Sequence, residues 1–294
     1  MMSSTDRDGL GAGDPASTAV SVICTAKNAA ATIERTIESI LAQNFPNWEM
    51  IIVDDGSTDD TVSVAHAFAQ ADPRIRLVAT AGIGRGRALN RALAEAGADL
   101  VANIDADDEG HPSLLRCLLQ AMNQHPQFTI MSTEWIRIHG AARPDWPDID
   151  IDPPLAVADV TRALAFYNPI YHSSVMMRKA VIVGLGGYDE ERHSVFDWDL
   201  WVRCAAAGLR LGRIRLPLGA QRIHPDQFYQ YSSRLRYLMA GAAVQRRAMR
   251  ALGIAPVYLP VIGLRFLWGI LPLRVRLGVR DLRHLLRPPQ SRSS

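Results

Sequence analysis

The sequence predicts a mixed α/β fold, in which helices flank a central, mostly parallel β-sheet and a helical, apolar and basic extension follows. Three observations lead to this prediction. Short apolar runs alternate with helix-like segments through the first 125 residues, which is typical of right-handed βαβ units. Two of these runs are each followed at once by an acidic cluster, DDGSTDD at 54–60 and DADD at 105–108. With 294 residues, 48% of them hydrophobic, the chain can bury a large core.

The spacing of apolar residues predicts the elements of the first half. Short apolar runs predict buried strands at 20–24, 49–53, 75–79 and 100–104. Apolar residues at helical spacing predict helices at 32–43, 61–71, 87–96 and 112–123. Ser57, Thr58 and Asp59 are expected to cap the helix that begins at Thr61.

After about Phe128 the pattern is less regular. We expect strands at 129–139 and 172–178, with a loop rich in Pro and Asp at 141–156 between them. Helices are expected at 197–207, where Gly208 ends the helix, and at 234–252.

Charge separates the C-terminal part from the rest. Residues 1–233 hold 20 Lys and Arg against 29 Asp and Glu, whereas residues 234–294 hold 12 Arg and one acidic residue, Asp281. Such asymmetry predicts that the basic part has a partner of its own. The first 18 residues are polar and have no apolar core, so we expect a disordered tail and no signal peptide.

The cysteines and the apolar C-terminal stretch bear on localisation. Cys24, Cys117 and Cys204 lie far apart without metal-type spacing, which favours a reducing compartment and hence a cytoplasmic protein. Residues 257–273 are apolar except for Arg265, but two prolines interrupt them and they fall short of the ~20 residues that span a bilayer. Further arginines follow, at positions 274, 276, 280, 283 and 287.

Two interpretations of this stretch remain open. Residues 257–287 contact the anionic inner face of the cell membrane, or they form a helical hairpin packed on the preceding domain with a solvated basic end. The arginines lack aromatic stacking partners and a known motif, so we expect no nucleic-acid partner.

The two acidic clusters indicate what the site binds. Ligands of open α/β sheets bind beyond the carboxyl ends of the strands, where both clusters are expected. Carboxylates gathered there repel one another unless a cation or hydrogen-bond donors offset their charge. The clusters therefore predict a nucleotide and a divalent metal side by side, although Asp54 and Asp55 could also cap the next helix.

Five motifs in order resemble the family 2 glycosyltransferases, which are inverting enzymes with a GT-A-type nucleotide-diphospho-sugar transferase fold. These motifs are VSVICTAKN (20–28), IIVDDGSTDDT (51–61), NIDADD (103–108), GGYDE (186–190) and FDWDLWVRCAAAG (196–208). The resemblance covers about residues 19–225. It implies a catalytic domain at 19–233, with a nucleotide-binding half at 19–125 and an acceptor half at 126–233, before the extension at 234–294.

The resemblance implies a set of donor-binding residues. Thr25 and Asn28 would contact base and ribose, although Asn28 could instead belong to a plain turn after the strand. Asp55 would accept the ring N3–H of uracil, a contact that cytosine cannot make, while Asp54 supports the turn. Asp105 would contact the ribose.

The diphosphate and the metal have candidate ligands of their own. In GIGRGR (82–87), which is no GxGxxG dinucleotide loop, Arg85 or Arg87 would pair with the diphosphate. The resemblance further implies that Asp107 or Asp108 binds Mg²⁺ or Mn²⁺ and that His224 contacts metal or diphosphate.

Asp197 matches the general base of the family, which removes the proton of the acceptor hydroxyl. The chain departs from the family one residue earlier, where Phe196 replaces the usual Glu. Asp199 is the second candidate for the base, and Trp198 and Trp201 at helical spacing are expected in the core.

The function implied is transfer of a sugar from a nucleotide-diphospho-sugar, with UDP favoured, to a glycan or lipid-linked acceptor. The setting would be bacterial polysaccharide or surface-glycan synthesis, by analogy. A non-catalytic sugar-nucleotide-binding or scaffold protein is the alternative, motivated by Phe196. A phosphohydrolase of the haloacid-dehalogenase type is disfavoured, because its DxD follows the first strand and not the fourth.

Overall fold

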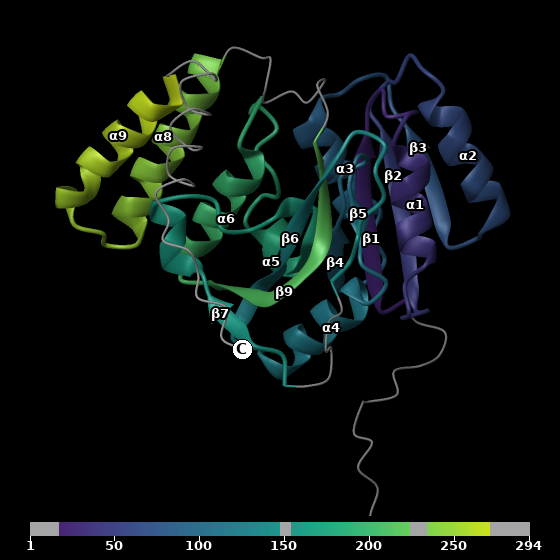
Figure 1. Cartoon of the computed structure of the whole chain (residues 1–294), viewed down its shortest axis with the longest axis horizontal. Coiled ribbons are helices and arrows are strands. Elements are labelled where there is room, and N and C mark those ends of the chain that lie inside the picture. The colour runs from purple at the N-terminus through teal and green to yellow at the C-terminus, as the bar shows by residue number, and fades with distance from the viewer. Residues whose placement is uncertain (1–17, 148–153, 224–233, 271–294) are drawn as a thin grey trace, which may run out of the picture.

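The computed structural model describes residues 18–147, 154–223 and 234–270. Within them nine strands form one sheet with helices on both faces (Figure 1). The strands are β1 (Val20–Ala26), β2 (Trp48–Asp54), β3 (Ile75–Ala79), β4 (Leu100–Asn103), β5 (Glu109–Gly110), β6 (Phe128–His139), β7 (Val157–Asp159), β8 (Val175–Arg178) and β9 (Arg210–Ile223). The α-helices are α1 (Ile33–Leu41), α2 (Thr61–Ala71), α3 (Arg85–Glu95), α4 (Leu114–Gln124), α5 (Lys179–Gly184), α6 (Phe196–Ala206), α8 (Arg234–Ala251) and α9 (Leu259–Ile270). The predicted mixed α/β fold is confirmed.

The first four strands form the parallel part of the sheet, in the order β3-β2-β1-β4. Successive residues of β2 point to opposite faces, so that Ile51 joins the core on the side of α3 and Ile52 the core on the side of α1 and α4. Helices cover both faces of the inner strands β1, β2 and β4, which are therefore mostly apolar, whereas Arg76 of the edge strand β3 is exposed.

The other part of the sheet mixes directions. Strand β8 lies antiparallel between β4 and β6, and β6 pairs in parallel with the long strand β9. The short strands β5 and β7 both pair antiparallel with β9. The sequence did not predict β9, because Pro217 and four arginines interrupt its apolar residues. The sheet accommodates Pro217 at a shift in the β6–β9 register.

Two elements near the acidic clusters differ from the prediction. The segment predicted as one strand at 172–178 begins with the 3-10 helix η2 (His172–Ser174), and only Val175–Arg178 pairs in the sheet. Helix α3 begins at Arg85, two residues earlier than predicted, because Gly84 adopts a φ of +92° and the chain turns there.

The last two described helices, α8 and α9, stack beside the part that contains the sheet. Helix α8 packs against α6 and the 3-10 helix η1 (Thr161–Ala165), and α9 packs on α8, at the end of the molecule opposite β3 (Figure 1). In the described part of the chain no helix is long and apolar enough to cross a membrane. The predicted tail at 1–18 lies almost wholly outside the described residues, as does everything after residue 270.

Candidate active site

The carboxyl ends of β1, β2 and β4 meet at one edge of the sheet. Ala26 pairs with Asp54, and Ile23 pairs with Asn103, so the chain leaves all three strands at this edge. Both acidic clusters follow directly, as predicted. Thr25, near the end of β1, pairs with Val53 and is partly buried.

The turn after β2 is closed by its own first aspartate. Asp54 accepts hydrogen bonds from the backbone N–H groups of Gly56 and Ser57, at 3.1 and 2.9 Å, which is the supporting role expected for it. Asp55 is buried, and its Oδ1 accepts the backbone N–H of Gly84 at 3.0 Å. Asp55 therefore joins the β2 turn to the loop that precedes α3. Gly56 is required there, because a Cβ atom would lie 2.7 Å from the Gly82 nitrogen.

Asn28 connects the end of β1 to the same turn. It adopts a left-handed φ of +51°, its Oδ1 accepts the backbone N–H of Thr58 at 2.8 Å, and its own N–H donates to Ser57 Oγ. Ser57 and Thr58 thus hold the β1 loop and do not cap α2, which corrects the prediction. Of the three predicted caps, Asp59 alone accepts the Thr61 N–H.

Three carboxylates come together after β4. Asp105, Asp107 and Asp108 each offer an oxygen, and these oxygens all lie within 4.8 Å of one another. Asp108 is buried, and it accepts hydrogen bonds from the backbone N–H of Arg222 at 2.9 Å and from Ser173 Oγ. Burial, together with the charges of Asp107 and Asp105, raises the pKa of Asp108 well above its usual range. A divalent cation would offset this repulsion, and an all-oxygen donor set suits Mg²⁺ or Mn²⁺.

Asp105 faces cationic and polar partners. Arg85 Nη2 lies 2.7 Å and His172 Nδ1 lies 3.0 Å from Asp105 Oδ1, and Asn103 Nδ2 donates to the same oxygen at 3.2 Å. Burial on its own raises the pKa of the Asp105 carboxyl, but Arg85 and His172 outweigh it and hold that pKa well below its usual range. The other ring nitrogen of His172 lies 2.9 Å from the Tyr188 hydroxyl.

Arg85 also connects the acidic group to helix α6. Its guanidinium lies 5.3 Å from the ring centroid of Phe196, the first residue of that helix. The next residue, Asp197, is in the first turn, and its Oδ2 accepts a hydrogen bond of 2.6 Å from Asn168 Nδ2. Phe196 thus supplies a ring that Arg85 stacks on, at the position where the family has Glu.

Arg87 points elsewhere. It lies 3.3 Å from Glu190 and 2.9 Å from Glu191, both in the loop after the GGY motif. Of the two arginines predicted for the diphosphate, the structure brings Arg85 alone to the acidic group. Asn90, one turn later on α3, holds that loop by exchanging hydrogen bonds of 2.8 Å with the Tyr188 backbone.

Asp199 forms ion pairs with three arginines. It is therefore unsuited to act as the general base. It is 1% exposed and lies between Arg192, Arg203 and Arg247, at 2.9, 3.0 and 2.7 Å. We call these four residues the Asp199 cluster. Trp198 and Trp201 are buried in the core as expected.

Three residues near the acidic group were not predicted in this role. His172, Ser173 and Arg222 contact Asp105 or Asp108 across at least 65 positions in the chain, a distance over which single-residue patterns give no signal. His224, a predicted metal or diphosphate contact, lies outside the described residues, two positions after Arg222.

This mixed sheet, with a carboxylate group at the edge where its parallel strands end, is a GT-A-type fold. The family model "Glycosyl transferase family 2" matches residues 21–181, and the chain belongs to this family. It is therefore a glycosyltransferase.

Relatives and solved structures agree with this assignment. The chain is 30% identical to the "putative glycosyltransferase EpsE" of Bacillus subtilis over 79% of its own length and 82% of that protein. It is 26% identical to the amylovoran biosynthesis glycosyltransferase AmsE of Erwinia amylovora, over 60% of this chain and 65% of the other.

Two solved structures share the fold. Residues 1–349 of S. aureus TarS, solved with UDP-GlcNAc, superpose with a TM-score of 0.60 at 16% identity, over 87% of this chain and 82% of that one. The mannosyltransferase PcManGT of Pyrobaculum calidifontis, solved with GDP-Man and Mn²⁺, superposes with a TM-score of 0.58 at 22% identity, over 92% and 81% of the two chains.

Proposed function

We propose that this glycosyltransferase moves a sugar from a nucleotide-diphospho-sugar to an acceptor hydroxyl with inversion, with the help of Mg²⁺ or Mn²⁺. The observation on which the proposal rests is the group of three carboxylates within 4.8 Å beside Arg85. The structures of TarS with UDP-GlcNAc and of PcManGT with GDP-Man and Mn²⁺ support this donor class. The amylovoran biosynthesis glycosyltransferase supports a role in bacterial polysaccharide or surface-glycan synthesis. The proposal includes a glycan or lipid-linked acceptor and a cytoplasmic location.

In this proposal the donor occupies the carboxyl edge of the sheet. Thr25, Asn28 and Asp55 lie along its nucleoside, and the Asp55 carboxylate would accept N3–H of a uracil, which favours UDP. Asp105 binds the ribose, and the Arg85 guanidinium is the cation nearest to the diphosphate. Arg87 is paired with Glu190 and Glu191 and would contribute less than Arg85 to binding of the diphosphate.

The metal would be held by Asp107 and Asp108, with His224 as a further candidate ligand. Bound there, it would neutralise the negative charge that builds up on the leaving diphosphate. As a ligand, Asp108 would be a carboxylate, the form that a bound cation favours.

Asp197 acts as the general base. The acceptor oxygen forms a bond to the anomeric carbon while the bond from that carbon to the diphosphate oxygen breaks. The proton of the acceptor hydroxyl goes to the Asp197 carboxylate, and the nucleoside diphosphate leaves with the bonding electrons. Asn168 holds Asp197 Oδ2 at 2.6 Å, which fixes the direction of the carboxylate.

The first test separates catalysis from binding. Release of nucleoside diphosphate from UDP- and GDP-sugars is measured with Mn²⁺ for the wild type, for Asp197→Asn and for the control Glu191→Gln, whose side chain is exposed on the loop. We expect Asp197→Asn to lower kcat by about 10²–10⁴-fold and to keep the affinity for the nucleotide in calorimetry. Glu191→Gln should stay within about twofold of the wild type.

The outcomes are distinct. Turnover that survives in Asp197→Asn would show that another group is the base. Nucleotide binding without turnover in the wild type would favour the non-catalytic alternative. Failure of every nucleotide to bind would contradict the donor site itself.

A further inference from the structure

We propose that the outer face of α8 and α9 docks on the surface of a bilayer that contains anionic phospholipid. We call this surface the α8–α9 face and define it by exposed apolar residues and by two arginines. Its members are Leu235, Met239, Val257, Leu264, Leu267, Arg246 and Arg250. The proposal concerns binding and does not depend on the donor or the chemistry.

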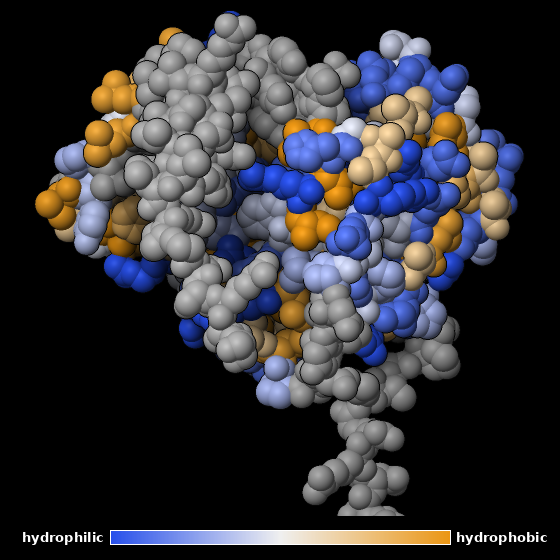
Figure 2. Space-filling view, viewed as in Figure 1, coloured by the Kyte–Doolittle hydropathy of each residue, from blue (hydrophilic) through white to orange (hydrophobic). Residues whose placement is uncertain are grey.

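Exposed apolar side chains are concentrated on these helices. Ten large hydrophobic side chains are exposed in the described part of the chain, and seven of them lie within residues 234–270. Met239 is 57%, Leu264 67% and Leu267 62% exposed. Figure 2 shows apolar residues gathered over α8 and α9 at the left edge of the molecule. A surface of this kind, next to polar residues, marks an interaction site.

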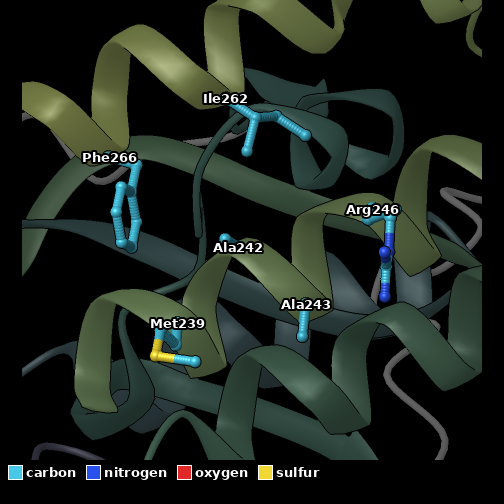
Figure 3. A pocket seen from close by; sticks show the side chains of 6 residues that line it. All are labelled: Met239, Ala242, Ala243, Arg246, Ile262 and Phe266. Atoms are coloured by element: carbon cyan, nitrogen blue, oxygen red, sulfur yellow. The ribbon is translucent and has the colours of Figure 1, made fainter. Parts of the chain in front are cut away.

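Helical spacing places the two exposed leucines of α9 on one side of that helix. Leu264 and Leu267 lie three positions apart on α9, and Ile262 and Phe266 occupy its opposite side. In Figure 3, Ile262 and Phe266 point from α9 toward α8. Leu264 and Leu267 consequently face away from α8.

The groove between the two helices has room for part of a lipid chain. It has a volume of about 380 Å³, and the described side chains that line it are apolar except for Arg246. The apolar ones are Met239, Ala242, Ala243, Ile262 and Phe266 (Figure 3). Apolar walls beside a guanidinium suit an acyl chain that ends in a phosphate headgroup.

Charge identifies the partner as anionic. Residues 234–270 include six arginines and no Asp or Glu, whereas residues 1–233 have an excess of acidic residues. Basic segments are attracted to anionic lipid, at about fivefold in affinity for each arginine near the surface. A nucleic acid would use the charge but would leave the exposed leucines in water. A bilayer surface satisfies both features at once.

The docked helices would also be connected to the catalytic part. Arg247 of α8 lies 2.7 Å from Asp199, two residues after Asp197 on α6. This ion pair joins the helix that carries part of the α8–α9 face to α6.

The test is co-sedimentation of the full-length protein with vesicles. The vesicles are made of phosphatidylcholine alone or with about one third phosphatidylglycerol, at low and high salt. The variants are Leu264→Ser/Leu267→Ser and Arg246→Gln/Arg250→Gln. The control is Val183→Ser on α5, where an exposed valine (53%) lies away from α8 and α9. Thermal melts establish that each variant is folded.

We expect the wild type to bind the anionic vesicles and to bind them less at high salt. The double leucine variant should lose about tenfold or more in affinity, and the control should not change. The double arginine variant should lose affinity for anionic vesicles and keep that for neutral ones.

Several results would overturn the proposal. One is a wild type that does not bind anionic vesicles, and another is a leucine variant that binds as well as the control. A dimer in light scattering that becomes monomeric in the leucine variant, without vesicle binding, would assign the face to a second copy of the chain. A leucine variant with a lower melting temperature and normal vesicle binding would mean that the leucines contact the protein itself. The face would then be assigned to residues 271–294 of the same chain.

Discussion

Asp105 is the residue at which three elements of the site meet. It follows β4, faces Arg85 of α3 and is contacted by His172 of η2. Arg85 in turn stacks on Phe196 of α6. Arg85 partly neutralises the carboxylate group. We infer that a bound diphosphate would compete with Asp105 for the same guanidinium.

The first prediction at this scale distinguishes the two arginines of α3. Arg85→Gln should weaken UDP binding in the presence of Mn²⁺ by roughly ten- to a hundredfold, because a charge-assisted hydrogen bond contributes about 1.5–3 kcal/mol. Arg87→Gln is the matched control, with an expected effect within about threefold, since Arg87 is paired with Glu190 and Glu191. Calorimetry measures both affinities. An equal loss in the two variants would contradict the assignment.

This distinction could not have come from the sequence. Arg85 and Arg87 are two positions apart at the start of a helix, so they point about 200° apart around its axis. Both have the same charge and both precede the same apolar residues. Only the position of α3 against Asp105 and against the 189–192 loop decides which arginine faces the site. The sequence also could not predict the contact between His172 and Asp105, because 67 positions separate the two residues.

At the scale of elements, apolar patterning predicted the first half well. Strands β1 to β4 and helices α1 to α4 were found from the sequence because the strands are short, mostly apolar runs and the helices have apolar residues at helical spacing. Strand β9 was missed, because arginines alternate with its apolar residues and Pro217 interrupts it. The motifs of the family located the carboxylate group, whereas the contacts that orient it come from η2 and β9.

The Asp199 cluster leads to a prediction about helix α6. Its arginines come from three places, the loop at 192, α6 itself and α8, and Asp199 is buried among them. Asp199→Asn should lower the free energy of unfolding by about 3 kcal/mol, because it leaves several cations close together without their counter-charge. The melting temperature should fall by on the order of 10 °C.

The control for this prediction is Arg247→Gln. Arg247 is 44% exposed, so its ion pair with Asp199 is screened by solvent and should contribute less than about 1 kcal/mol. Thermal and urea melts followed by circular dichroism compare the two variants. A similar loss in both would mean that the α8 contact dominates the cluster, and the absence of any loss in Asp199→Asn would refute its stabilising role.

At the scale of the whole molecule, the described chain has an acidic site at one edge of the sheet and a basic, apolar pair of helices packed on α6. Asp105, Asp107 and Asp108 are kept close by the fold although their charges repel. The raised pKa of Asp108 is the consequence of that repulsion and of burial. The folded state should therefore be stabilised by any divalent cation that the group binds, because the unfolded chain does not hold the three carboxylates together.

The last prediction is a thermal shift that depends on this carboxylate group. With Mn²⁺ and UDP at about a hundred times their Kd, the free energy of unfolding should rise by about 2.7 kcal/mol. In a chain of this size the melting temperature should then rise by about 5–10 °C. Asp107→Asn should lose most of the shift with Mn²⁺, whereas Asp159→Asn, whose carboxylate pairs with Arg210 away from the site, should keep it. A shift of the same size in Asp107→Asn would place the cation elsewhere, and EDTA without effect on the UDP shift would show that the nucleotide binds without metal.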